Sequence, residues 1–329
     1  MIRCLSNILL IVGWISTSAL AYAETTDLPD VRVGVLRFGT VNWETDVIAH
    51  HKLDQANGFS LTVLPYASNQ ASHVALQAGE AQVIVADWLL AARMQASGAD
   101  MTFVPYSTAI GSMMVPGDTA IKSLADLKGK RVGIAGGPLD KSWLLLRAET
   151  QAKLGFDLAD EVEAVFGAPP LLNEELKAGR LDALLTYWHY AAKLQVAGMR
   201  RMVSVADVAR QMGGGAVMPS LGFVFSNAWA KANPKAIAGL ISASRAAKQI
   251  MAQSDTEWDR LQPLLKSDDA ATRDALRDSF RTGIPKSWGP AERRGVAKVF
   301  MIMRQMGGDT FTGRVLSLPD ETFWLNADF

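Results

Sequence analysis

Short apolar runs alternate with segments of helical periodicity along the first hundred residues. The runs that predict strands are residues 31–36, 59–64 and 82–86, and the segments that predict helices are residues 44–56, 71–78 and 89–96. Pro65 closes the second of these strands, and Gly58 and Gly98 follow helical segments, where a left-handed residue commonly ends a helix. Strands that alternate with helices of this length indicate a parallel sheet wound by right-handed crossovers.

The alternation changes after residue 100, and a second α/β unit follows. Strands are predicted at residues 101–107, 111–115, 130–135, 162–166, 181–186 and 221–225, with helices at residues 141–154 and 173–178. Asn173 could cap the second of these helices. The first two strands have no helix between them, and the glycine-rich loop 212–219 precedes the last one, so both places suit a chain that crosses between lobes.

The remainder of the chain has helical periodicity, with expected helix starts near Asn233, Ser254 and Pro290 and an expected end of the last helix at Gly307-Gly308. We therefore predict an α/β fold of two lobes. The predicted bounds are residues 24–107 for the first part of lobe 1, residues 108–220 for lobe 2, and residues 221–329 for the return to lobe 1 and the C-terminal helices.

The N-terminal residues have the three parts of a secretory signal peptide. Arg3 supplies a positive charge, residues 8–15 are apolar, and Ala21-Tyr22-Ala23 fits a cleavage site before Glu24. The apolar run is far shorter than the roughly 20 residues that span a bilayer, which argues against a membrane anchor. Cys4 precedes the apolar run, whereas a lipid-anchoring cysteine would follow it. We predict a signal peptide over residues 1–23 and a periplasmic protein.

Composition narrows the class of protein further. Cys4 is the only cysteine, so the chain after the predicted cleavage has no disulfide and no thiol chemistry, and its hydrophobic content of 49% must supply the core. Lys plus Arg and Asp plus Glu number 33 each. This balance argues against a nucleic-acid partner, because proteins that bind polyanions carry a basic excess on one face.

The order of the segments, with four local phrases, resembles the periplasmic solute-binding proteins of ABC importers, specifically the nitrate, sulfonate, taurine and thiamine-precursor group. The phrases are residues 31–35, 76–83, 121–133 and 176–183, and the third, IKSLADLKGKRVG, is the most specific. The resemblance implies the two-lobed periplasmic binding protein fold (type II), with two crossing strands as the hinge and a ligand in the cleft between the lobes. It implies a small-molecule ligand and an ABC permease in the inner membrane as partners. We expect no cofactor and a monomer.

Open α/β sheets bind ligands beyond the carboxyl ends of their strands, so the residues that follow the strands are the candidate wall of the cleft. These candidates are Asn42, Trp43, Asn69, Asp87, Trp88, Asp140, Ser142, Trp143, Tyr187, Trp188 and His189. Four of them are tryptophans in strand-to-helix loops, the arrangement needed to line a cleft with flat faces. Because tryptophan often fills core, we expect about two of the four to touch the ligand.

Several candidates also have a plain local role. Asn69 either caps a helix or leaves unpaired N–H groups to an anion, and Asp87 could cap residues 89–96 while Trp88 packs. Asp87 stands where small, proline or hydroxyl residues are usual in the resembled family, and a carboxylate at the cleft disfavours an anionic ligand. With Asp140 nearby, the site suits a ligand with a cationic or donor group and a flat apolar part.

An enzyme needs a catalytic constellation, and the sequence has no G-x-S-x-G elbow, no H-E-x-x-H and no Cys/His cluster. The resembled group includes enzymes that make the thiamine pyrimidine, but their cysteine-rich segment is absent here. His189 with Asp87 and Asp140 could share a metal, since imidazole and carboxylate both bind zinc or copper. A ligand-binding sensor, or an accessory protein of a periplasmic dehydrogenase system, stays open as an alternative to a transport receptor.

Overall fold

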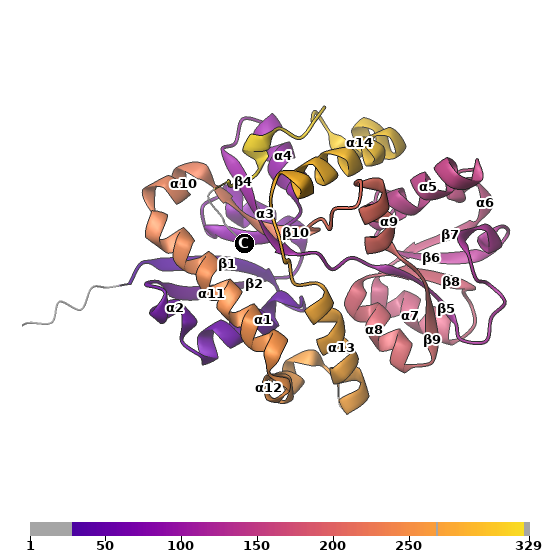
Figure 1. Ribbon diagram of the computed structural model, residues 1–329, viewed down its shortest axis with the longest axis horizontal. Coiled ribbons are helices and arrows are strands. Elements are labelled where there is room, and N and C mark those ends of the chain that lie inside the picture. The colour runs from indigo at the N-terminus through magenta and orange to yellow at the C-terminus, as the bar shows by residue number, and fades with distance from the viewer. Residues whose placement is uncertain (1–27, 268, 326–329) are drawn as a thin grey trace, which may run out of the picture.

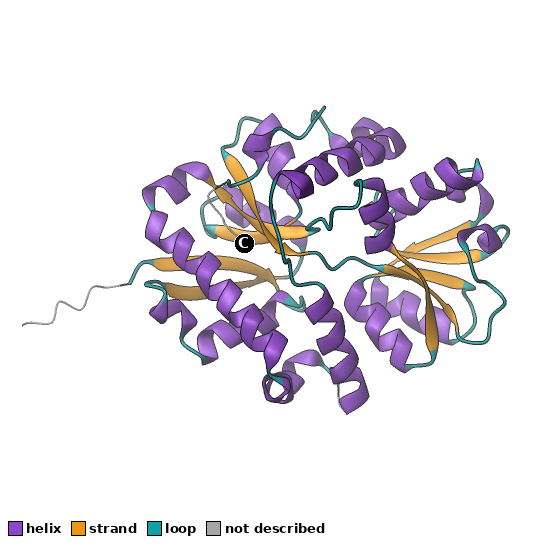
Figure 2. Cartoon of the chain, in the orientation of Figure 1, coloured by secondary structure: helices purple, strands orange, loops and turns teal. Residues whose placement is uncertain are grey.

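The computed structural model describes residues 28–267 and 269–325, so the predicted signal peptide lies outside the described residues. Within them the chain forms two lobes, each built on a five-stranded sheet (Figure 1). Helices pack on both faces of each sheet (Figure 2). The predicted two-lobed α/β fold is confirmed.

The sheet of the first lobe combines four strands from the first part of the chain with one strand that follows the second lobe. Its strands are β1 (Asp30–Leu36), β2 (Ser60–Tyr66), β3 (Val83–Ala86), β4 (Met101–Ser107) and β10 (Leu221–Ser226). Their order is β2-β1-β3-β10-β4, with β1 parallel to β2 and β3, and with β10 antiparallel to both of its neighbours. Pro65 lies inside β2, which is an edge strand, and an edge tolerates the missing N–H of proline.

The sheet of the second lobe repeats this arrangement. Its strands are β5 (Ser112–Pro116), β6 (Arg131–Ala135), β7 (Glu163–Gly167), β8 (Ala183–Thr186) and β9 (Met199–Ser204). Their order is β7-β6-β8-β5-β9, and β5 is antiparallel to β8 and β9. In each sheet the antiparallel inner strand is therefore the one that the chain forms after crossing from the other lobe.

Most helices connect the strands of one lobe. The first lobe has α1 (Val41–His50), α2 (Leu53–Ala56), α3 (Asn69–Gln77) and α4 (Trp88–Ala96). The second lobe has η1 (Leu124–Leu127), α5 (Lys141–Leu154), α6 (Leu158–Glu161), α7 (Pro169–Lys177), α8 (Trp188–Val196) and α9 (Val205–Met212). The helices that follow β10 are α10 (Asn227–Ala232), α11 (Pro234–Gln253), α12 (Asp255–Leu265), α13 (Ala270–Thr282), α14 (Pro290–Thr312) and η2 (Asp320–Thr322).

The last two long helices contact both lobes. The helix α13 packs against α11 and α12 of the first lobe and against α8 of the second. The helix α14 packs against α5 and α9 of the second lobe, while its Phe300 contacts Trp88 of the first. Figure 1 shows α13 and α14 on opposite sides of the segments that join the lobes.

The chain crosses between the sheets at residues 108–111 and 213–220. The two crossings are tied together, because Ser220 donates its N–H to Ser107 O at 2.8 Å and its hydroxyl to Ala109 O at 2.7 Å. At Gly111 a Cβ would lie 2.2 Å from Thr186 O. Only glycine fits this close approach of two backbones.

Three helix ends differ from the sequence prediction. The helix α7 begins at Pro169, a residue type favoured at the first helical position, so Asn173 is buried in the helix interior and caps nothing. The predicted helix over residues 44–56 is divided by Lys52, which has a left-handed φ of 53°. The last helix is interrupted at the expected Gly307-Gly308, where Gly308 has a φ of 59°, but α14 continues beyond this kink to Thr312.

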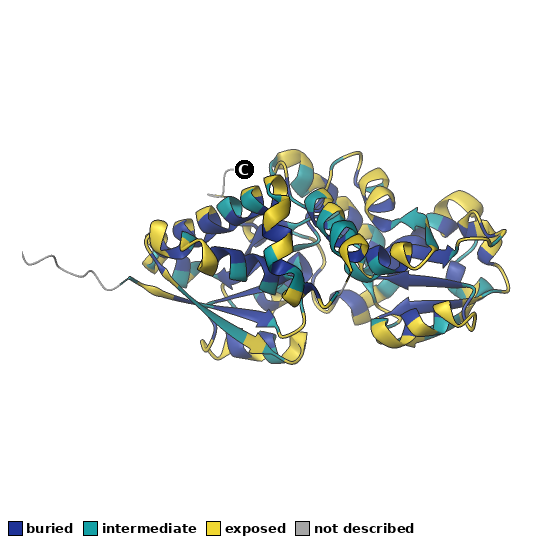
Figure 3. Cartoon of the chain, turned by 90° about the horizontal axis from the view of Figure 1, so that it is seen from below, coloured by how far each residue is buried: buried dark blue, intermediate teal, exposed yellow. Residues whose placement is uncertain are grey.

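Both lobes have an apolar interior, and one cluster of buried side chains includes Ile84 of the first lobe and Ile134 of the second. Figure 3 shows buried strands between helices whose outer faces are exposed. Phe59, Phe225 and Trp258 are fully buried in the first lobe, and Met113 and Ile134 in the second. No helix among residues 28–267 and 269–325 has the length and apolar character needed to cross a membrane.

Candidate functional site

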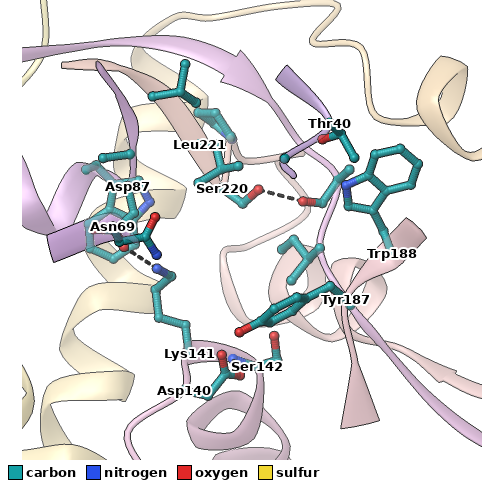
Figure 4. A pocket seen from close by; sticks show the side chains of 18 of the residues that line it. Thr40, Asn69, Asp87, Asp140, Lys141, Ser142, Tyr187, Trp188, Ser220 and Leu221 are labelled. Atoms are coloured by element: carbon teal, nitrogen blue, oxygen red, sulfur yellow. Dashed lines mark hydrogen bonds and ion pairs between the residues drawn. The ribbon is translucent and has the colours of Figure 1, made fainter. Parts of the chain in front are cut away.

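A cavity of about 380 Å³ lies between the lobes, where the carboxyl ends of the strands face each other. Residues of β1, α1, α3, β3 and α4 form its wall on the first lobe, and residues of α5, α8 and α9 form its wall on the second. Both crossing segments and one side of α14 complete the lining. Figure 4 shows the polar and aromatic side chains that converge there.

Asp87 is the charged group on the first-lobe wall. It is the N-cap of α4, and its Oδ1 accepts the Leu90 N–H at 2.9 Å. Its Oδ2 pairs with the ammonium of Lys141, which belongs to the second lobe, so this ion pair spans the cavity (Figure 4). Burial raises the pKa of the Asp87 carboxyl, but the charge and hydrogen bond of Lys141, the Leu90 N–H and the Arg93 charge together outweigh that effect, so the pKa lies below its usual value.

Asp140 is the carboxylate of the second-lobe wall. It is the N-cap of α5 and accepts the N–H groups of Ser142 and Trp143 at 2.9 and 3.2 Å, both at Oδ1. Burial raises its pKa, against the opposing effect of Lys141. Its Oδ2 and the Tyr187 hydroxyl lie equally close to Gly136, each 3.3 Å from the position that a Cβ there would take. Both N-cap aspartates therefore face the cavity from opposite lobes.

The other polar groups of the cavity are uncharged near neutral pH. Burial, then Asp140 and Tyr190, raise the pKa of Tyr187 to about 12. Burial and the nearby Lys193 lower the pKa of His189 to about 4, and its buried Nδ1 has no hydrogen-bond partner among the described residues. Burial also lowers the pKa of His73. These groups offer hydrogen bonds to a ligand without adding charge.

Two of the four candidate tryptophans line the cavity. Trp88 contacts Phe300 edge to face at 6.2 Å, and Trp188 contacts Trp43 edge to face at 5.8 Å. Trp43 itself is core, with its indole N–H donating to Leu264 O at 3.3 Å, and Trp143 is only 1% exposed. Trp88 and Trp188 are therefore the two tryptophans placed where a ligand in the cavity could contact them.

Eight of the eleven candidate residues line the cavity, namely Asn69, Asp87, Trp88, Asp140, Ser142, Tyr187, Trp188 and His189. Asn42, Trp43 and Trp143 do not. The Asn42 amide donates to Leu36 O and Gly39 O at 2.7 and 2.8 Å, so it holds the loop in place instead of facing a ligand. Asn69 caps nothing, because Ser68 is the N-cap of α3 and accepts the Ala71 N–H at 3.2 Å.

Sequence reasoning missed several lining residues. Lys141 follows a candidate aspartate directly, and a basic residue at the first position of a helix was the signal that could have found it. Thr40 is the N-cap of α1, and Ser72 and His73 lie in the first half of α3, close to the candidate Asn69. Ser220 and the α14 residues Val296, Val299 and Met303 come from distant parts of the chain, and no local pattern marks them.

The residues that the structure describes contain no group of three or more His, Cys, Asp or Glu side chains placed to hold a metal ion. His189, Asp87 and Asp140 all line the cavity, but they do not form such a group. The arrangement instead provides flat apolar faces, neutral hydrogen-bonding groups and one ion pair.

Two α/β lobes linked by two crossings, with the cavity between them, define the architecture of a two-lobed binding protein. The family described as "NMT1/THI5 like" matches residues 55–257, more than half of the chain. The protein belongs to this family.

Solved structures share the fold at low sequence identity. The periplasmic aliphatic sulphonate binding protein SsuA from Escherichia coli is 18% identical, with a TM-score of 0.72 over 91% of this chain and 93% of that one. The alkanesulfonate-binding protein SsuA from Xanthomonas axonopodis pv. citri, bound to MOPS, is 18% identical, with a TM-score of 0.61 over 84% and 94%. The desulfurization enzyme DSZB is 13% identical, with a TM-score of 0.57 over 87% and 96%. No curated protein matches the chain.

Proposed function

We propose that the protein is a periplasmic solute-binding receptor that delivers a small organic molecule to an ABC-type importer. The observation that carries this proposal is the cavity of about 380 Å³, lined by both lobes and by both crossing segments. A solute held there contacts both lobes at once, so it stabilises the closed arrangement over an open one. The permease would recognise this closed form, and the receptor would act as a monomer.

The fold likeness to the SsuA proteins supports the same function, since their descriptions name them as binding proteins. The likeness to the desulfurization enzyme shows that this fold also carries catalysis. For the present chain, binding without turnover is the better supported function, because the cavity combines aromatic faces and neutral polar groups with an ion pair that is already satisfied. The eight lining candidates are the proposed ligand-binding residues.

The test begins with mass spectrometry of small molecules that co-purify with the folded protein. The identified solute is then titrated while tryptophan fluorescence is recorded, because Trp88 and Trp188 line the cavity. We expect Trp188→Ala and Asp87→Ala each to weaken binding at least about tenfold, since each removes a contact worth more than about 1.4 kcal/mol.

Asp118→Ala, in an exposed turn, and Trp229→Ala, on α10 away from the cavity, are the matched controls. Normal affinity in both cavity variants would refute the site. Chemical conversion of the bound solute would refute the receptor and favour an enzyme. Normal solute uptake in cells that lack the protein would favour a sensor or accessory protein.

A further inference from the structure

Lys141 occupies a position that helix electrostatics disfavours. It is the first residue of α5, next to the N-cap Asp140, where the helix dipole repels a positive charge. Its ammonium turns away from the helix and crosses the cavity to Asp87 on the other lobe (Figure 4). A residue that breaks a local rule inside a candidate site is a candidate for a functional role.

The cavity has one more carboxylate than it has ammonium groups. Among the described residues that line it, the charged side chains are Asp87, Asp140 and Lys141. His73 and His189 do not balance the excess, because burial lowers the pKa of each and keeps the imidazole neutral near pH 7. Lys141 pairs with Asp87, whereas the Asp140 carboxylate accepts the helix N–H groups of Ser142 and Trp143.

We propose that the solute is a monocation and that Lys141 sets this specificity by moving between the two carboxylates. The cationic group of the solute takes the place of the Lys141 ammonium at Asp87, and Lys141 turns to its sequence neighbour Asp140. Each carboxylate then faces one cation, and the solute replaces Lys141 as the bridge between the lobes. This inference rests on the proposed receptor function and names the substrate class of the same cavity.

Charge balance explains why other solutes are rejected. An anion that displaced Lys141 from Asp87 would place a third negative charge in the cavity, and a neutral solute would leave the Asp87 carboxylate without a cation. A buried charge left without its partner is strongly unfavourable. Trp88 and Trp188 add flat apolar faces to the cavity wall, and these favour a cation that carries an apolar or ring portion.

The test uses probes that differ in charge at similar shape: benzylammonium and benzyltrimethylammonium as monocations, benzyl alcohol as the neutral probe, and benzenesulfonate as the anion. Binding to the purified protein is followed by calorimetry and by tryptophan fluorescence. We expect at least one monocation to bind at millimolar or lower concentration, and more tightly than the alcohol and the sulfonate.

Two variants test whether Lys141 and Asp87 determine the preference for a monocation. Lys141→Met removes the internal competitor and should raise the affinity for the monocation about tenfold, and by more than the affinity for the alcohol. Asp87→Asn keeps the helix cap, because asparagine caps as well as aspartate, and should lower the monocation affinity at least about tenfold. Lys153→Met, on the same helix α5 and paired with Glu149, is the control.

The proposal is overturned if benzenesulfonate or benzyl alcohol binds more tightly than both monocations, if no monocation binds, or if Lys141→Met leaves the monocation affinity unchanged or lower. These outcomes differ from failure of the receptor function. A neutral or anionic solute found with the purified protein would refute the monocation and leave the receptor standing. A protein that binds no solute would refute both.

Discussion

His189 shows how burial sets the charge of one cavity residue. Its pKa is lowered from 6.5 to about 4, mainly because burial disfavours the imidazolium. As pH falls, the unfolded chain binds this proton first, so the folded protein loses stability from about pH 6.5 down to about pH 4. The stability contribution is fully present only above that window.

We expect this histidine alone to account for a loss of about 2 kcal/mol between about pH 7 and about pH 5. The measurement is urea unfolding across this range for the wild type and for His189→Gln, whose side chain does not titrate. Between pH 7 and pH 5, the free energy of unfolding of the wild type should fall by about 2 kcal/mol more than that of His189→Gln. His50→Gln, at the exposed end of α1, is the control, and parallel profiles for wild type and His189→Gln would contradict the prediction.

At the scale of elements, a buried ion pair joins α1 to α11 in the first lobe. Lys248 Nζ lies 2.5 Å from Glu44 Oε2, Ser244 donates its hydroxyl to Glu44 Oε1 at 2.5 Å, and the ammonium lies 3.8 Å from the centre of the Tyr106 ring. Glu44 is 1% exposed and Lys248 is 8% exposed. Removing one partner of such a pair leaves a buried charge unbalanced.

Lys248→Met should therefore lower the free energy of unfolding by about 3–5 kcal/mol, as measured by urea denaturation followed by circular dichroism. The double variant Glu44→Leu with Lys248→Met should recover most of this loss, because an apolar pair of similar volume has no unpaired charge. Lys235→Met, at the exposed start of the same helix, is the control. A double variant no more stable than Lys248→Met would refute the explanation.

Local sequence patterns predicted best the elements whose ends are marked by a capping residue or by glycine. The strand at 31–36 is β1, and the helix at 141–154 is α5, which begins after the capping Asp140 and ends at the left-handed Gly155. The helix α7 was misplaced because two signals competed, and Pro169 determined the start in place of Asn173. The edge strand β9 (MRRMVS) was missed because its arginines interrupt the apolar pattern.

At the scale of the molecule, the sequence predicted only those site residues that lie in the turns directly after the strands. Strand-to-helix turns are local features, so residues such as Asp87 and Trp188 could be placed near the cleft. The α14 wall and the Asp87–Lys141 pair depend on how the lobes and the last helix pack, and segments far apart in sequence decide that packing. Trp43 and Trp143 follow the same turns but point into core, a difference that the sequence pattern does not contain.

A further contact between the lobes, formed by Lys193, makes their relative position testable without a ligand. Lys193 of α8, in the second lobe, donates to Leu265 O and Lys266 O at 3.2 and 3.3 Å. These carbonyls end α12 of the first lobe, where the helix dipole attracts a cation. Lys193 thus supplies from one lobe the C-terminal cap of a helix in the other, and any opening of the lobes must break this cap.

We expect Lys193→Met to broaden the distribution of distances between the lobes and to shift it to longer values. Spin labels at Val74→Cys on α3 and Leu171→Cys on α7, both exposed and on opposite lobes, report this distance in a protein that starts at Glu24 and so lacks Cys4. Lys177→Met removes a surface ion pair with Glu174 inside the second lobe and should leave the distribution unchanged. If Lys193→Met also leaves it unchanged, the cap does not hold the lobes, and their closure depends on the Asp87–Lys141 pair and the aromatic contacts of Trp188.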